Sequence, residues 1–342
     1  MRLLDDAMKT ANAKSGMTRY AAIDVGTNTV RLLVADADRA GTYHVAYGEQ
    51  VITRLGERIT ETGVLSAAAM DRTIRVLVHY AGTAKELGAA AVIGVATSAA
   101  REATNRQAFL DRVRQEAGLD IQVISAETEA TMTALGVAHA LGPDRTALLI
   151  VDIGGGSTEF IALDHGKIAG SVSLPIGVVK LTEAYLESDP PSPAQLDAAS
   201  EFIRKRLQDV PESLRHPPGA ILAGTAGTPT TLAAIDLGLL QYDAKRVTGH
   251  RLSRRRIQEL LEGFCALPLA RRRQIVGLEP ARADVILSGT LLTREILDLF
   301  GFDEVTVSDG GLREGILLHH LSHRNRPVRE KRPRKDRNRS PH

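Results

Sequence analysis

The chain contains short runs of apolar residues that end abruptly at glycine or at small hydroxylated residues. Two are the clearest: Leu148 to Phe160, LLIVDIGGGSTEF, and Ala22 to Val34, AIDVGTNTVRLLV. An uninterrupted apolar run predicts a strand buried on both faces, and the glycines behind it let the backbone approach a ligand closely. Similar runs predict buried strands at residues 90–96, 121–124, 219–223 and 304–307.

Between these strands the apolar spacing changes to that of helices. Ile74, Leu77, Val78 and Ala81 recur at helical spacing, which predicts a helix from Ser66 to about residue 87. Further helices are expected near residues 109–116, 128–141 and 193–207. Strands followed by helices in this order favour an α/β fold with mostly parallel sheets, in which a ligand binds at the carboxyl ends of the strands.

The two glycine turns have the same design. Asp24 and Gly26 stand in the first turn where Asp152 and Gly154 stand in the second, and small hydroxylated residues follow in both. Backbone N–H groups in such a turn can converge on an anion, hydroxyl groups add donors, and the carboxylates suit a divalent cation. The copies lie about one domain apart, so we predict two related lobes whose turns enclose a phosphate. For one copy alone, a tight turn with incidental, turn-capping acids is the alternative.

Composition sets further bounds. At 342 residues, with 43% hydrophobic and 25% charged residues, the chain is long enough for two domains with real cores. Cys265 is the sole cysteine, which excludes an internal disulfide and fits a reducing cytoplasm. No apolar run approaches the roughly 18 residues of a membrane span, so we expect a cytoplasmic protein without a membrane partner. The histidines show no paired ligand spacing and predict no metal site.

The two ends of the chain differ from the middle. Residues 1–16 carry acids at Asp5 and Asp6 and no apolar core, so they do not read as a secretory signal, and we expect a disordered extension. Residues 323–342 hold nine lysines and arginines and two acids, which predicts a disordered basic tail. The tail is open to two interpretations, a site for polyphosphate or RNA and a solvated terminus. We favour the second, because a charge run without aromatic residues is weak support for a nucleic-acid site.

The glycine turns belong to a longer ordered set of segments. The set comprises AIDVGTNTVRLLV, ATSAAREATN, SAETEA, IVDIGGGSTEF, AGTAGTPTTLAA and VSDGGLREG. In this order and spacing, across residues 18–320, the segments resemble the exopolyphosphatase and guanosine pentaphosphate phosphohydrolase family. The resemblance implies an α/β fold of two ribonuclease H-like lobes, of the actin, hexokinase and Hsp70 type, with the active site in the cleft between them. It implies a short, two-lobed member, with the first lobe at residues 17–144 and the second at 145–322.

The same resemblance assigns the catalytic role to Glu129 of SAETEA. Hydrolysis of a terminal phosphoanhydride needs a carboxylate that orients or deprotonates water, and positive charge on the phosphoryl oxygens. Glu129 is expected near the start of a helix after the last strand of the first lobe, from where it can point into the cleft. Without the family, Glu127 and Glu129 are better explained as acids that complement a helix dipole.

The resemblance also implies a Mg²⁺ site and a phosphate cradle. Asp24, Asp152 and Glu159 are the expected metal-binding residues, and a monovalent cation such as K⁺ is a further candidate cofactor. Arg54 and Arg101 are expected to clamp the substrate, with surface ion pairing as the alternative for both. The other expected phosphate contacts are Thr27, Asn28, Gly154, Gly155, Gly156, Ser157 and Thr158. The turn at residues 224–228 lies where nucleotide-binding relatives hold adenosine, and it either lines the cleft or packs a helix onto a strand.

These expectations describe a Mg²⁺-dependent exopolyphosphatase that releases the terminal phosphate of inorganic polyphosphate. Guanosine pentaphosphate is the alternative substrate. A sugar or acetate-type kinase and a non-catalytic sensor of polyphosphate or alarmone are more distant alternatives. The glutamate pair and the closing SDGGLREG segment argue against the kinase, and the acids at 24, 129, 152 and 159 argue against the sensor. No nucleic-acid partner is expected, and a homodimer is a candidate assembly.

Overall fold

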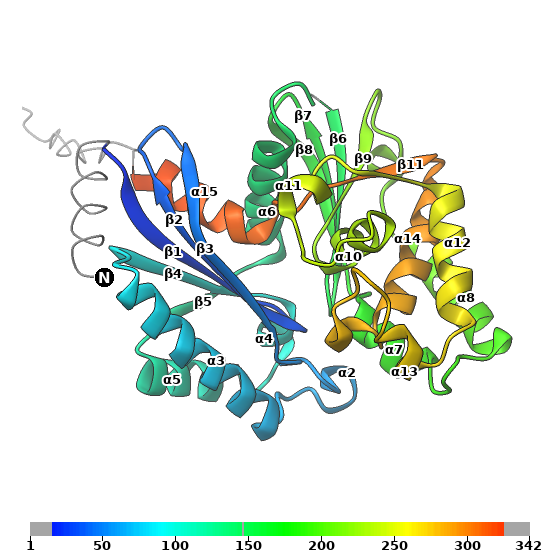
Figure 1. Ribbon diagram of the computed structural model, residues 1–342, viewed down its shortest axis with the longest axis horizontal. Coiled ribbons are helices and arrows are strands. Elements are labelled where there is room, and N and C mark those ends of the chain that lie inside the picture. Colours follow the sequence, from blue (N-terminus) through cyan, green and yellow to red (C-terminus); the bar gives the residue numbers. More distant parts are fainter. Residues whose placement is uncertain (1–15, 146, 325–342) are drawn as a thin grey trace, which may run out of the picture.

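The computed structural model describes residues 16–145 and 147–324 and shows two lobes, each built on one sheet (Figure 1). The first sheet has the order β3-β2-β1-β4-β5 and the second β10-β11-β9-β6-β7-β8. The strands of the first are β1 (Thr18–Val25), β2 (Thr29–Ala37), β3 (Tyr43–Ile52), β4 (Ala91–Ala96) and β5 (Ile121–Val123). Those of the second are β6 (Ala147–Ile153), β7 (Thr158–Asp164), β8 (Lys167–Leu174), β9 (Ile221–Thr225), β10 (Arg251–Ser253) and β11 (Glu304–Val307).

The two sheets repeat one arrangement around the glycine turns. β1 pairs antiparallel with β2 and parallel with β4, and β6 pairs antiparallel with β7 and parallel with β9. The prediction of mostly parallel sheets is therefore wrong, and both sheets are mixed. Each glycine turn joins its two strands directly, and so short a connection permits only antiparallel pairing. The predicted α/β fold of two related lobes is confirmed.

The first lobe also contains helices, two of which pack on one face of its sheet. They are α2 (Ile59–Thr62), α3 (Ala67–Glu86), α4 (Ser98–Glu102) and α5 (Arg106–Ala117). The long helix α3 begins as the sequence predicts, because the Ser66 hydroxyl accepts a hydrogen bond from the Ala69 N–H at 3.1 Å. Its apolar face, with Ile74 and Leu77, packs with strand residues and with Phe109 of α5 in a buried core.

The second lobe contains most of the remaining helices. They are α7 (Val178–Tyr185), α8 (Pro193–Leu207), α9 (Glu212–Arg215), α10 (Gly227–Asp236), α11 (Ala244–Val247), α12 (Arg254–Cys265), α13 (Leu269–Arg272), the 3₁₀ helix η1 (Pro280–Arg282) and α14 (Ile286–Phe300). Helix α14 is buried along almost its whole length, and Phe300 at its end lies 5.4 Å from the ring of Phe160 on β7. No helix within the described ranges is long and apolar enough to cross a membrane.

Two helices, α6 (Ala126–Leu141) and α15 (Leu312–Arg324), cross between the lobes (Figure 1). Helix α6 packs through Val137 against the second sheet, whereas α15, from the end of the chain, packs through Ile316 against the first. The crossing is tight. A Cβ at Gly136 would lie 1.9 Å from the Gly311 carbonyl oxygen, so glycine is required there.

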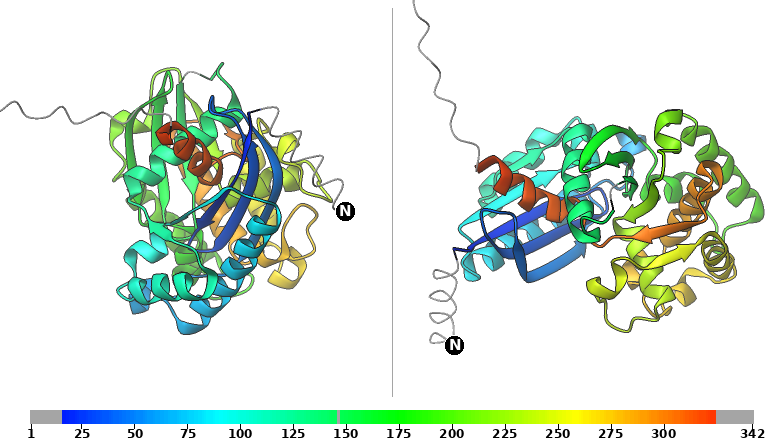
Figure 2. Two further views of the ribbon diagram at one scale, coloured as in Figure 1. Left: turned by 90° about the vertical axis from the view of Figure 1, so that its left-hand side faces the viewer. Right: turned by 90° about the horizontal axis from the view of Figure 1, so that it is seen from above.

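Helix α15 also bears on the predicted boundaries. The sequence places residues up to 322 in the second lobe, but α15 rests on the sheet of the first, as both views of Figure 2 show. The helix also continues to Arg324, two residues into the predicted tail. The rest of that tail, and the predicted N-terminal extension apart from residue 16, lie outside the described residues.

Candidate functional site

A cleft of about 1250 Å³ lies between the lobes, at the ends of the strands that precede the glycine turns. It brings together most of the residues that the sequence singled out. Those that line it are Asp24, Thr27, Asn28, Glu129, Asp152, Gly154, Gly155, Gly156, Ser157 and Glu159. Residues from both lobes, far apart in sequence, thus share one concave site.

The two glycine turns lie against each other at the bottom of this cleft. A Cβ at Gly156 would lie 2.7 Å from the Thr27 hydroxyl and 2.7 Å from the Ser98 hydroxyl. A Cβ at Gly155 would lie 3.0 Å from Cβ of Asn28. The second turn can approach the first this closely only because its residues lack side chains. Thr27, Asn28 and the glycines of the second turn therefore lie together in the cleft.

Asp24, at the end of β1, is buried beside a positive charge. Its Oδ2 lies 3.3 Å from Nη1 of Arg31, the residue opposite it in the β1–β2 hairpin. The other carboxylate oxygen, Oδ1, is buried and accepts no hydrogen bond from any described residue. Burial raises the pKa of Asp24 above its ordinary value, and the Arg31 guanidinium offsets part of this rise.

Glu129 is buried in the first turn of α6. The Ser125 hydroxyl caps this helix by accepting from the Thr128 N–H at 3.2 Å, which fixes where the first turn points. Nη1 of Arg101 donates to Oε2 of Glu129 at 2.9 Å. Burial, followed by the negative charge of Glu159, raises the pKa of Glu129 well above its ordinary value, although Arg101 opposes this.

The two acids of the second lobe accept hydrogen bonds from hydroxyl groups. Asp152 accepts a hydrogen bond from Thr133 at 3.3 Å, and Glu159 accepts one from Ser173 at 2.7 Å. Burial and the neighbouring Glu159 raise the pKa of Asp152 to about 7, and burial also raises the pKa of Glu159. These two carboxylates face each other in the β6–β7 hairpin, where no described lysine or arginine forms an ion pair with either.

The donor set of the cleft fits Mg²⁺. No three histidine, cysteine, aspartate or glutamate side chains of the described residues are grouped closely enough to form a complete metal cage. Mg²⁺ does not need one, since it commonly takes one or two carboxylates and completes its shell with water and substrate phosphates. Within the described residues, Asp152 and Glu159 form no ion pair with a lysine or arginine, and Oδ1 of Asp24 accepts no hydrogen bond. A Mg²⁺ ion held by one or two of these carboxylates, with water completing its shell, would supply the missing positive charge.

Three predicted site residues do not line the cleft. Nη2 of Arg54 lies 2.5 Å from Oδ2 of Asp284 in the other lobe. Arg101 is held by Glu129 and by the Ile124 carbonyl at 3.0 Å. The Thr158 side chain is fully buried and donates to the Ile176 carbonyl at 2.6 Å, because successive residues of a strand point to opposite faces.

Other residues that line the cleft were not predicted, among them Ser98, Arg31, Arg282 and Arg313. Arg282 is buried and donates to Gln50 of the first lobe at 3.3 Å. Burial and the nearby Arg31 guanidinium lower its pKa. Arg31 was detectable as the hairpin partner of Asp24, whereas Arg282 stands in a segment without a strand or glycine pattern to mark it.

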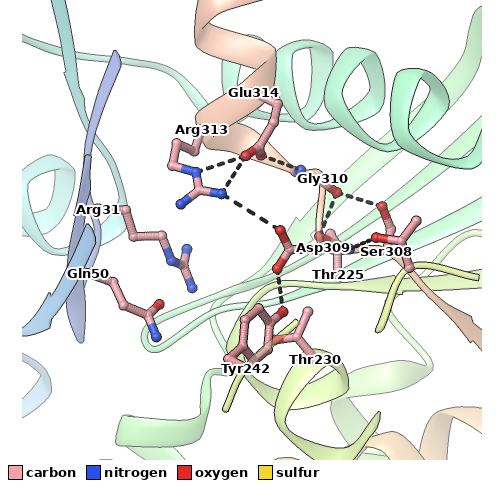
Figure 3. A network of polar contacts seen from close by, with 12 residues as sticks. Arg31, Gln50, Thr225, Thr230, Tyr242, Ser308, Asp309, Gly310, Arg313 and Glu314 are labelled. Carbon is pink, nitrogen blue, oxygen red and sulfur yellow. Dashed lines mark hydrogen bonds and ion pairs between the residues drawn. The ribbon is translucent and has the colours of Figure 1, made fainter. Parts of the chain in front are cut away.

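The far half of the cleft holds a polar network, drawn in Figure 3. Asp309 accepts a hydrogen bond from the Tyr242 hydroxyl, and Arg313 donates to Glu314 at 2.6 and 2.8 Å. Arg31 and Gln50 approach this network from the other lobe. The turn at residues 224–228 contributes Thr225 to the cleft wall, where its hydroxyl donates to the Gly310 carbonyl at 3.1 Å. The turn therefore lines the cleft.

Comparisons with known proteins agree with this geometry. The model of the Ppx/GppA phosphatase family matches residues 33–324. Exopolyphosphatase 2 of Mycobacterium tuberculosis is 34% identical over 314 residues, which cover 88% of this chain and 98% of that protein. A crystal structure of the Aquifex aeolicus Ppx/GppA family member has a TM-score of 0.77 at 36% identity and covers 91% of this chain and 100% of its own. A crystal structure of an exopolyphosphatase from Cytophaga hutchinsonii has a TM-score of 0.82 at 29% identity and covers 90% of this chain and 98% of its own. The chain thus belongs to the Ppx/GppA phosphatase family and is a phosphatase.

Proposed function

We propose that the protein hydrolyses the terminal phosphoanhydride of inorganic polyphosphate and releases orthophosphate. The observation that carries the proposal is the position of Glu129, a buried carboxylate in the same cleft as both glycine turns. A phosphate held by the turns would lie beside a group able to activate water. The relatives named exopolyphosphatase support polyphosphate as the substrate.

The turns and the arginines would bind the terminal phosphoryl group. Thr27, Asn28, Ser157 and the backbone of the second turn supply donors on both sides. Arg31 and Arg282 approach each other across the cleft, and an anion between them would relieve their repulsion. Preorganised donors and positive charges of this kind stabilise the charge that develops during phosphoryl transfer.

Glu129 would orient and deprotonate the attacking water. Arg101 holds one of its carboxylate oxygens, and the other forms no hydrogen bond within the described residues, which leaves it available to water. A general base works best when its pKa is near the working pH, and burial has moved the pKa of Glu129 in that direction. Arg101 would thus act on the base and not on the phosphate chain.

Asp152 and Glu159, with Asp24 through its free Oδ1, would hold Mg²⁺. When bound, the ion would supply positive charge to the phosphoryl oxygens and neutralise the buried acids. The raised pKa values of these acids have the same origin, since burial in mutual proximity disfavours their charged forms unless a cation is present.

A competition assay tests the substrate. Purified protein with Mg²⁺ would be given polyphosphates of several lengths or guanosine pentaphosphate, and phosphate release would be measured. We expect the larger kcat/KM with polyphosphate. A larger value with the nucleotide would overturn this substrate assignment and favour guanosine pentaphosphate, which the family name also allows.

A further inference from the structure

The lobes also touch on the side of the cleft away from the crossing helices α6 and α15. There α4 of the first lobe approaches α7 of the second (Figure 1). Nζ of Lys180 donates to both carboxylate oxygens of Glu102, at 2.8 and 3.0 Å. The Lys180 side chain is 12% exposed and the Glu102 side chain 39%, so the pair is partly open to water and its strength depends on salt.

The Lys180 end of this pair leads directly to the second glycine turn. The N–H groups of Val178 and Val179, at the start of α7, donate to the carbonyls of Gly154 and Gly155 at 3.0 and 2.9 Å. Lys180 is the next residue. Because a helix is stiff over one turn, a displacement of Lys180 also displaces the glycine turn.

The Glu102 end leads to the groups of the first lobe. The Ser98 hydroxyl, which lines the cleft opposite Gly156, donates to Oε1 of Glu102 at 2.7 Å. Arg101, the residue before Glu102, holds the carboxylate of Glu129. One carboxylate therefore contacts the second lobe and is connected to both Ser98 and the base.

We infer that Lys180 and Glu102 are positioning residues, which hold the second glycine turn in register with Ser98, Arg101 and Glu129. Neither residue lines the cleft, so their effect on the reaction is indirect. A displacement of about 1 Å between reacting groups can cost up to a hundredfold in rate, which is why a contact at this distance from the phosphate matters.

Two more contacts join the lobes in the same region. Glu183, on α7, accepts a hydrogen bond from the backbone N–H of Arg58 at 3.3 Å, and Arg54 pairs with Asp284. Together with the Lys180–Glu102 pair they close the cleft opposite the crossing helices. Substrate entry by lobe opening would break all three, and salt would weaken them.

Kinetics of three variants test the positioning role. We expect Lys180→Met to lower kcat about tenfold while KM changes less than about threefold, because each lobe still binds phosphate but the base loses its register. Lys180→Arg should keep activity within about threefold of the wild type. The double variant Lys180→Met/Glu102→Gln should be no worse than Lys180→Met, since both changes break the same ion pair and the amide oxygen can still accept from Ser98.

A matched control breaks an ion pair inside the first lobe. Arg112 contacts Asp71 at 2.8 Å and Glu116 at 2.8 Å, far from the cleft lining, so Arg112→Met should leave kcat unchanged. Additive losses in the double variant, or a wild-type kcat in Lys180→Met, would overturn the inference.

A distance measurement keeps the inference separate from the proposed function, on which the kinetic readout rests. Spin labels would replace the exposed Arg75 and Arg255, one on each lobe, in a Cys265→Ser background. We expect Lys180→Met to lengthen or broaden the distance between them. In the labelled protein that keeps Lys180 and Glu102, raising salt from about 0.05 to about 0.5 M should also lengthen or broaden this distance. This test does not depend on the folding of any Lys180 variant. Unchanged distances in both experiments would overturn the pairing whatever the substrate.

Discussion

The two hairpins that carry the glycine turns share one topology but differ in charge. Opposite Asp24 in the first hairpin stands Arg31, and opposite Asp152 in the second stands Glu159. In the first lobe the Arg31 guanidinium therefore offsets the charge of Asp24, whereas the second lobe places two buried carboxylates side by side. A like-charged pair in such a place is costly unless a cation joins it.

The difference suggests a division of labour between the lobes. In the first lobe Asp24 and Glu129 each have an arginine partner, and in the proposed function Glu129 is the acid that works on water. In the second lobe no described lysine or arginine forms an ion pair with Asp152 or Glu159, which form the cation-binding side in the proposed function. In the proposed function the repeated unit would thus serve two chemistries, set by the residue opposite its aspartate.

The largest expected effect is on turnover. Glu129→Gln should lower kcat on the order of a thousandfold, since a general base contributes about 10²- to 10⁴-fold. Phosphate release from polyphosphate under saturating Mg²⁺ measures it. Glu127→Gln, an exposed acid on the same helix turn, is the matched control and should retain wild-type kcat. Equal losses in both variants would mean that Glu129 supports the helix and not the reaction.

The second effect is on Mg²⁺ affinity, measured for one variant in each of the two hairpins. Asp152→Asn should weaken Mg²⁺ binding at least tenfold, because loss even of a group that only supports a metal ligand commonly costs 10- to 100-fold. Arg31→Met in the first hairpin should change it less than about threefold. Calorimetric titration with Mg²⁺ measures both. A larger loss in Arg31→Met than in Asp152→Asn would reverse the assignment of the two lobes.

The third effect is on the pH dependence of stability with EDTA present. The pKa of Asp152 is about 7 in the folded protein, against about 4 for an unfolded chain. Between these values the folded protein binds more protons, so its free energy of unfolding falls as the pH rises through the window. Urea unfolding should show higher stability at pH 5 than at pH 8, and Asp152→Asn should reduce the difference. A protein with EDTA that is more stable at pH 8 than at pH 5 contradicts the expected shift.

The smallest effect concerns the contact between the turns. Gly156→Ala places a methyl group 2.7 Å from the Thr27 and Ser98 hydroxyls, and overpacking of this kind typically costs about 1–3 kcal/mol. Thermal unfolding would show the loss. Gly82→Ala in α3 is the control, because its methyl group meets nothing within 4 Å, and it should be neutral or slightly stabilising. Equal stability of the two variants would show that the turns do not touch.

The residues that sequence reasoning located are those marked by local pattern. The aspartates and glycines of both turns stand at the end of apolar runs, and chain direction alone carries them to one edge of each sheet. Glu129 needed the family resemblance, because an acid in the first turn of a helix is ordinary. Its place in the cleft is set by the crossing of α6 and α15, a contact between distant parts of the chain.

The features that the sequence did not reveal depend on the length of side chains and on their alternation along a strand. Thr158 neighbours Glu159, but the alternation of the strand turns it into the core. Arg54 and Arg282 have long side chains whose guanidinium groups contact residues of the other lobe. No local sequence pattern near residue 54 or 282 indicates these contacts. The mixed sheets follow from the hairpins, and the strand–turn–strand units already implied them.

In the proposed function Glu129 acts on water while Asp152 and Glu159 of the second lobe hold the cation. Titration of Glu129→Gln with Mg²⁺, and then with tripolyphosphate, tests this most directly, because binding can be measured without turnover. We expect Mg²⁺ and tripolyphosphate affinities within about threefold of the wild type. A loss of Mg²⁺ affinity as large as that of Asp152→Asn would contradict the division between the lobes.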